Sequence, residues 1–63
     1  MTERQVMSVV WQEAGDIYVI YDSGEPDHMT ASSEVAAGFA AEVGLHLEQA
    51  GHGTLRWVRA PGA

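Results

Sequence analysis

Two segments in the first third of the chain have the residue pattern of β-strands. Residues 5–12 (QVMSVVWQ) and 16–22 (DIYVIYD) are rich in β-branched and aromatic side chains, which pack well in sheets. Gly15 lies between them and can adopt the positive φ that a tight turn requires. These residues therefore predict a β-hairpin.

The length of the connecting loop decides which side chains share a face of this hairpin. If residues 14–15 form a two-residue loop, Trp11 lies opposite Tyr18 and Val9 lies opposite Ile20. Both faces are then largely apolar, and one helix can cover only one of them. We predict that the uncovered face forms a dimer or partner interface. Its apolar residues are Val10, Ile17, Val19, Tyr21 and Trp57.

From about residue 31 to residue 50 the apolar positions change to a helical period. One arc of the helix, about 140° wide, collects seven apolar side chains. These are Val35, Ala36, Phe39, Ala40, Val43, Leu47 and Ala50. Thr30 or Ser32 can cap the start, and Gly51 suits the position after the last turn. A break near Gly44 is also compatible with the sequence, and Leu45 falls on the opposite, exposed side of the helix.

Residues 54–59 (TLRWVR) predict a final strand. The order of elements is then ββαβ, an α+β fold with a three-stranded, mainly antiparallel sheet and one helix packed on one face. We expect the helix to run antiparallel to the second strand. The 63 residues form a single small domain, in which residues 60–63 are expected to be a frayed tail.

A chain of 63 residues without cysteine has few ways to support a small core. Disulfides and thiolate zinc sites are excluded, so oligomerisation is the expected support and we predict a homodimer. The first residues lack a signal-peptide pattern, and the longest apolar run, residues 17–21, is too short to span a membrane. We therefore expect a cytoplasmic protein that does not bind membranes.

Between Arg4 and Arg56 the sequence holds eight of its nine acidic residues and no lysine or arginine. Such a surface repels nucleic acid and anionic lipid and favours a basic protein partner. The predicted layout gathers the carboxylates at two separated poles, which we assign to partner binding. The first pole holds Asp22, Glu25, Asp27 and Glu34, and the second holds Glu13, Asp16 and Glu48.

No catalytic, cofactor or metal site is predicted. The turn at residues 22–28 (DSGEPDH) has ligand types for hard cations, but it lacks the repeated register of a calcium loop and its distal glutamate. His28, His46 and His52 form neither an i,i+4 pair nor an HExxH motif, so a zinc site is not expected. The serines of the turns and of the helix start are explained by those positions, without a nucleophilic role.

Residues 56–59 (RWVR) hold a basic-aromatic cluster of a kind that can stack bases and contact phosphates. The ββα(β) layout is similar to that of the small arm-type DNA-binding domains of phage-type integrases, which would imply DNA contact through basic sheet residues. The corresponding strands here carry Glu13, Asp16 and Asp22 instead. We therefore expect no direct nucleic-acid binding, and we interpret Trp57 as a packing anchor.

The leading hypothesis is a small acidic, non-enzymatic protein-binding module. Inhibitors, immunity-type proteins and adaptors, including those of phage or plasmid origin, have this character. One alternative is a nucleic-acid mimic, such as an anti-restriction or anti-CRISPR protein, whose carboxylates occupy the phosphate sites of an enzyme. A second alternative is a small-ligand or metal-binding protein built on the turn at residues 22–28. The sequence does not distinguish the first two.

Overall fold

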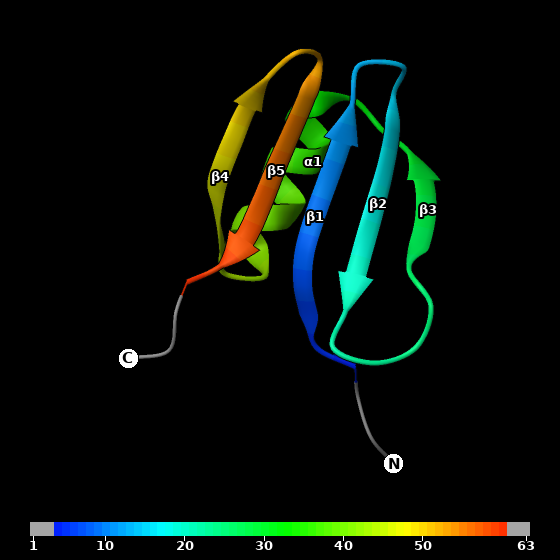
Figure 1. The fold of residues 1–63 in the computed structure, drawn as a ribbon, viewed down its shortest axis with the longest axis vertical. Coiled ribbons are helices and arrows are strands. Elements are labelled where there is room, and N and C mark those ends of the chain that lie inside the picture. The colour runs from blue at the N-terminus through cyan, green and yellow to red at the C-terminus, as the bar shows by residue number, and fades with distance from the viewer. Residues whose placement is uncertain (1–3, 61–63) are drawn as a thin grey trace.

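The computed structural model describes residues 4–60 as a five-stranded antiparallel sheet with one short helix on one face (Figure 1). The elements are β1 (Val6–Gln12), β2 (Asp16–Tyr21), β3 (Asp27–Thr30), α1 (Ser33–Glu42), β4 (Leu45–Gly51) and β5 (Thr54–Arg59). Across the sheet the strand order is β3-β2-β1-β5-β4. The predicted α+β class is correct. The predicted three-stranded ββαβ sheet is wrong, because two further segments pair at its edges.

The β1–β2 hairpin is closed by a three-residue loop, residues 13–15, and not by the predicted two-residue loop. The Gly15 amide donates to the Gln12 carbonyl across this loop at 2.8 Å. Val9 consequently pairs with Val19, one position away from its predicted partner. Because side chains alternate between the faces of a strand, this shift moves every side chain of β2 to the face opposite the predicted one.

This register corrects the predicted interface. Ile17, Val19 and Trp57, which we assigned to an uncovered face, are only 3%, 0% and 6% exposed. Tyr21 lies on the same side of β2 as these buried residues and is half-buried. Val10 lies on the other side of the sheet, so the five residues do not form one surface.

Helix α1 is shorter than predicted because it ends at Glu42, two residues before Gly44. Of the two expected caps, Ser32 is the one found: its hydroxyl accepts a hydrogen bond from the Val35 amide at 3.2 Å. After Glu42 the chain reaches Gly44, which has a φ of +81° and donates to the Ala41 carbonyl at 3.1 Å. A residue in this left-handed conformation terminates a helix. The predicted continuation to residue 50 is therefore wrong.

The residues after Gly44 form the edge strand β4. Leu45, predicted to be exposed, is only 8% exposed, whereas Leu47, predicted to lie in the core arc, is 51% exposed. Strands β4 and β5 are joined by His52 and Gly53, whose φ values are 54° and 72°. Two positive φ values in a two-residue loop are typical of hairpin turns, because their twist matches that of the strands.

Strand β3 is an exposed edge strand that leads the chain back along β2 before the helix begins. It pairs with β2 in a register that places His28 opposite Tyr18. The Ala31 amide then donates to the Gly15 carbonyl, at the tip of the first hairpin, at 2.8 Å. Helix α1 therefore starts near this tip and runs in the same direction as β2, opposite to the predicted direction (Figure 1).

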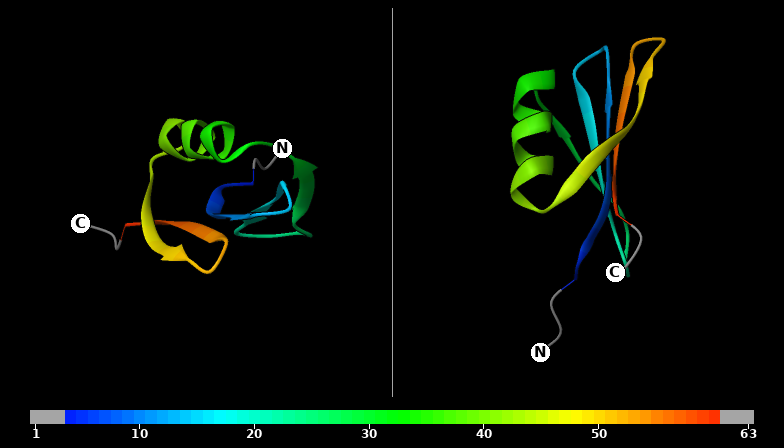
Figure 2. Two further views of the ribbon diagram at one scale, coloured as in Figure 1. Left: turned by 90° about the horizontal axis from the view of Figure 1, so that it is seen from above. Right: turned by 90° about the vertical axis from the view of Figure 1, so that its left-hand side faces the viewer.

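The core lies between α1 and one face of the sheet, which we call the covered face (Figure 2). Ala36 and Ala40 are fully buried, so the helix packs on the sheet through small side chains. The larger members of the same core cluster are Val9, Ile17, Leu45 and Trp57, and Val19 on the same face is also fully buried. At the margin, the half-buried Trp11 donates its indole N–H to the Ala31 carbonyl at 2.9 Å, which fixes the start of the helix.

The predicted tail lies almost entirely outside the described residues. Residues 61–63 of the predicted tail lie outside the described residues, and residue 60 follows β5 without regular structure. Within the part of the chain that the structure describes, no helix is long and apolar enough to cross a membrane.

Candidate interaction surface

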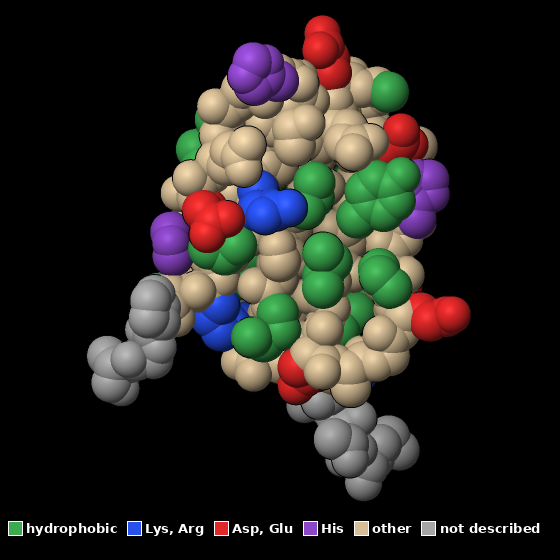
Figure 3. All heavy atoms as spheres, viewed as in Figure 1, with side chains coloured by type: hydrophobic (Ala, Val, Ile, Leu, Met, Phe, Trp, Pro, Cys, Tyr) green, Lys and Arg blue, Asp and Glu red, His purple; other side chains and the backbone are tan. Residues whose placement is uncertain are grey.

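The face of the sheet opposite α1 has no helix over it, and we call it the open face. Near its centre Val10 pairs with Tyr18, while Ser8 pairs with Ile20 on one side and Val58 on the other. The apolar patch consists of Val10, Tyr18, Ile20 and Val58. Ile20 is 37% exposed and the other three are half-buried. Figure 3 shows hydrophobic side chains gathered in the middle of this face.

Two polar side-chain pairs flank the apolar patch on opposite sides. On the β3 side, Nε2 of His28 lies 2.9 Å from Oδ1 of Asp16, and the imidazole stacks on the Tyr18 ring with centroids 4.8 Å apart. On the β4 side, Nη1 of Arg56 lies 3.8 Å from Oε1 of Glu48. Exposed side-chain pairs of this kind contribute only about 0–1 kcal/mol each to the stability of the folded protein. Both flanks can therefore exchange these contacts for contacts with a partner.

The polar groups next to the apolar patch are already hydrogen-bonded within the chain. The Ser8 hydroxyl donates to the Trp57 carbonyl at 2.9 Å. Among the described residues, no buried side-chain nitrogen or oxygen lacks a partner. Met7, at a β-bulge directly before Ser8, adds an apolar side chain that is 39% exposed. A partner can therefore remove water from the Ser8 hydroxyl without leaving it unpaired.

The lower end of the sheet, where β2 leads into the loop before β3, contains carboxylates with structural contacts. Oδ1 of Asp22 accepts a hydrogen bond from the Gln5 amide at 3.1 Å. Oδ2 of Asp27 accepts one from the Tyr21 hydroxyl at 2.7 Å, and this bond is the main reason that the pKa of Tyr21 is raised. The Arg4 guanidinium lies over the Tyr21 ring, 4.1 Å from its centroid.

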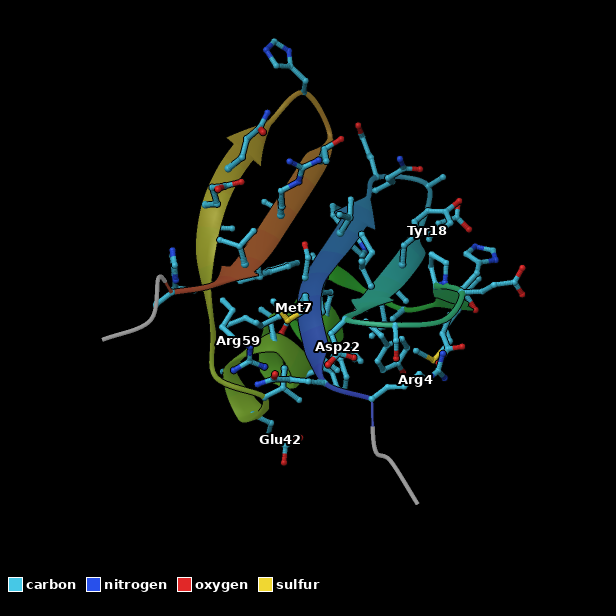
Figure 4. The ribbon with its side chains drawn as sticks, turned by 60° about the horizontal axis from the view of Figure 1, so that its bottom comes forward. Arg4, Met7, Tyr18, Asp22, Glu42 and Arg59 are labelled. Carbon is cyan, nitrogen blue, oxygen red and sulfur yellow. The ribbon has the colours of Figure 1, made fainter. Side chains whose placement is uncertain are left out.

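The predicted first acidic pole is therefore partly found at this lower end. It holds Asp22, Glu25 and Asp27, and the helix ends nearby at Glu42, which sequence reasoning missed (Figure 4). The signal for Glu42 was the break at Gly44, because a helix that ends there places Glu42 in its last turn.

The other predicted acidic residues are divided differently. Glu34 does not lie at the first pole as predicted, because α1 begins beside the hairpin tip that carries Glu13 and Asp16. Glu48 does not lie at the second pole as predicted, because it belongs to β4 and lies beside Arg56. Glu13, Asp16 and Glu34 therefore lie at the same end of the molecule.

The basic residues of β5 do not form a continuous surface. Nε and Nη2 of Arg59 donate to the Val6 carbonyl, and Nη2 also reaches the Val43 carbonyl at 3.3 Å. Arg59 therefore links the start of β1 to the end of α1. Trp57 is buried on the covered face, whereas Arg56 lies on the open face. The interpretation of Trp57 as a packing anchor is confirmed.

No enclosed site for chemistry was found within residues 4–60. This part of the chain forms no pocket, and it places no three His, Cys, Asp or Glu side chains where they could share a metal ion. The expectations of no cofactor, no metal and no catalysis stay predictions.

Sequence reasoning missed Tyr18, Ile20 and Val58 as residues of the uncovered surface. The available signal was the loop at residues 13–15, since three-residue hairpin loops with a glycine in the left-handed region are common. A three-residue loop at this position predicts the observed pairing of β1 with β2, and with it the side of the sheet on which each side chain of β2 lies.

Neither a protein-family model, nor a curated protein, nor a solved structure matches this chain. The function of its surfaces has to be inferred from their own residues.

Proposed function

We propose that this protein is a non-enzymatic, acidic interaction module that binds a protein with a basic surface. One observation carries this proposal. Four exposed carboxylates form no side-chain hydrogen bond or ion pair with any described residue, and they lie toward both ends of the molecule. These four carboxylates are Glu13, Glu25, Glu34 and Glu42.

The charge of the whole chain acts in the same direction. Its formal net charge is −6, and the longest dimension of the molecule is 35 Å. Charge spread over this length attracts a basic protein from a distance and raises the rate of productive encounters. The same field opposes nucleic acid and anionic lipid.

Such a module acts by occupying the surface of its partner, as inhibitors, immunity-type proteins and adaptors do. A chain without an enclosed pocket among its described residues has no space in which a bound substrate could be shielded from water. Binding itself would therefore be the activity.

Affinity capture with a matched variant tests this proposal. The wild-type chain and a fourfold variant (Glu13→Gln, Glu25→Gln, Glu34→Gln and Glu42→Gln) are immobilised and exposed to the same lysate. We expect the wild type to retain a basic protein that is released by salt, and the variant to lose it while keeping its circular dichroism spectrum. A variant with two added amides and unchanged charge, Ala37→Gln with Ala41→Gln, should retain it.

The result also separates the proposal from its alternatives. If nucleic acid competes with the chain for the captured protein, the partner site is a nucleic-acid site and the chain is a mimic. Equal retention by wild type and fourfold variant, or retention that salt does not affect, would contradict the proposed role of the carboxylates.

A further inference from the structure

We propose that a second copy of this chain covers the open face, so that two sheets pack face to face through the apolar patch. This proposal is independent of the partner proposed above, because it uses a different surface. The patch presents Val10, Tyr18, Ile20 and Val58 on a sheet of five strands. Two such sheets pack about 10 Å apart when the side chains of their inner faces interdigitate.

The charge on the open face permits this approach. The strand pairing places the carboxylate of Asp16 and the guanidinium of Arg56 on this side, and the ion pair with Arg56 places the carboxylate of Glu48 beside them. The formal charge of the face is therefore −1, whereas the whole chain carries −6. Figure 3 shows most acidic side chains at the margin of the face, away from its centre. A basic partner would find little complementary charge at this centre.

The two flanks of the patch are complementary to each other under twofold symmetry. An axis parallel to β1 and between the two sheets places the β2 flank of one copy over the β5 flank of the other. Arg56 and Tyr18 both pair with Val10 and are level along the strands, and Asp16 lies two residues nearer the tip. That step is about 7 Å, which an arginine side chain can span. Arg56 of each copy then faces Asp16 of the other, and the contact forms twice.

The dimer and the basic partner respond to salt in opposite directions. Two chains of −6 repel each other at long range, and salt screens this repulsion. Salt also weakens the two Arg56–Asp16 contacts at the rim, but this is the smaller effect, and burial of the apolar patch is left intact. We expect the dimer dissociation constant to fall or stay constant between about 0.05 M and about 0.5 M salt. Binding of a basic partner weakens over the same range. Failure of one proposal is therefore distinguishable from failure of the other.

Sedimentation equilibrium of the purified chain tests the dimer. We expect a mass of twice 6.8 kDa at micromolar concentration. Ile20→Lys should raise the dissociation constant at least about tenfold, because it places two buried, unpaired cations in the interface. The control, Val35→Lys, makes the same charge change on α1, where Val35 is 60% exposed, and should leave the dimer unchanged. Circular dichroism and thermal unfolding show whether each variant is folded.

A charge exchange tests the symmetry. Arg56→Asp and Asp16→Arg should each weaken the dimer, and the double variant should recover most of the loss because it restores the opposite charges across the axis. A monomer at micromolar concentration, or equal dissociation by Ile20→Lys and Val35→Lys, would overturn the proposed interface. Absence of recovery in the double variant would overturn the arrangement of the two copies.

Discussion

The covered face and the open face of the same sheet differ in burial far more than in composition. Val9 and Val19 pair on the covered face and are fully buried, whereas Val10 and Ile20, one position along each strand, are only partly buried. A ten-residue helix that meets the sheet through alanines contributes to this difference, because Ala36 and Ala40 share one core cluster with Val9. Small side chains on a helix allow close approach, so one short element can bury several large side chains of the strands. An apolar pattern in a strand therefore shows what can be buried, and the neighbouring element decides what is buried.

The pair Val9→Ala and Val10→Ala compares the two faces most directly, because the residues are identical and adjacent in β1. Val9→Ala should lower the free energy of unfolding by roughly 2–3 kcal/mol, since it leaves a cavity in a fully buried site. For a domain of this size that is a large part of a total of roughly 3–9 kcal/mol. Val10→Ala should cost less than about 1 kcal/mol in the monomer. Urea unfolding at low protein concentration measures both.

The concentration dependence of these measurements sharpens the comparison. The cost of Val10→Ala should grow as the protein concentration rises through the dimer dissociation constant, because folding is then coupled to association. The cost of Val9→Ala should stay nearly constant. Equal costs for the two variants at low concentration would show that the two faces are buried alike.

Overpacking tests the close contact between helix and covered face. Ala40→Leu should destabilise the protein by about 1–3 kcal/mol, because Ala40 is fully buried and the added atoms have no space. Ala41→Leu, at the next and exposed position of α1, should have little effect. Thermal unfolding of both variants measures the difference. A tolerated Ala40→Leu would mean that the helix does not rest on its alanines.

Much of this layout could be predicted from the sequence, where the pattern was long or had a strong local signal. Strands β1, β2 and β5, the Ser32 cap, and the apolar character of both sheet faces are examples. The hairpin register failed because loops of two and three residues both place Gly15 in a turn, and a shift of one residue exchanges the faces. Correct strands with a wrong loop thus gave a wrong candidate surface.

The edges of the sheet were not predictable for a different reason. Around β4 the spacing of Val43, Leu47 and Ala50 fits a helix, while the alternation of Leu45 and Leu47 fits a strand. A run this short cannot distinguish the two structures. Strand β3 is exposed at all four residues, so it has no apolar period at all. Its structure depends on pairing with β2, which a local pattern does not contain. The candidate acidic poles changed with β3, because it reversed the direction of α1.

Two glycines, one within α1 and one just after it, test the point at which the helix ends and the strand begins. Gly44→Ala should cost about 1–2 kcal/mol, because Gly44 has a φ of +81° and alanine is strained there. The space around it is not the reason, since the nearest atom outside its chain neighbours would lie 3.9 Å from an added Cβ. Gly38→Ala, within α1 and with no atom within 4 Å of an added Cβ, should stabilise the protein by roughly 0.5–1 kcal/mol. Opposite shifts in the urea midpoint are the expected result, and a gain from both would place Gly44 inside a continuous helix.

The smallest expected effect lies at the margin of the covered face, where Tyr21 donates to Asp27. This hydrogen bond requires the neutral phenol, and it raises the pKa of Tyr21 above its ordinary value of about 10. The contribution of the bond to stability is therefore complete below about pH 10 and is lost as the pH rises through the raised pKa of the folded state. Asp27→Asn removes the carboxylate, so the pKa of Tyr21 should fall toward the ordinary value.

An ultraviolet titration of phenolate formation in a Tyr18→Phe background isolates Tyr21, because the chain has two tyrosines. Glu25→Gln is the matched control: it also removes one carboxylate from the lower end, but the Glu25 side chain makes no contact with Tyr21 among the described hydrogen bonds. The fall in the pKa of Tyr21 should be clear for Asp27→Asn and small for Glu25→Gln. Equal shifts would mean that the general negative charge of this end, and not the bond from β2 to β3, holds the proton on Tyr21. In that case the attachment of β3 would rest on its backbone pairing with β2, and the edge of the sheet would keep its stability through the titration.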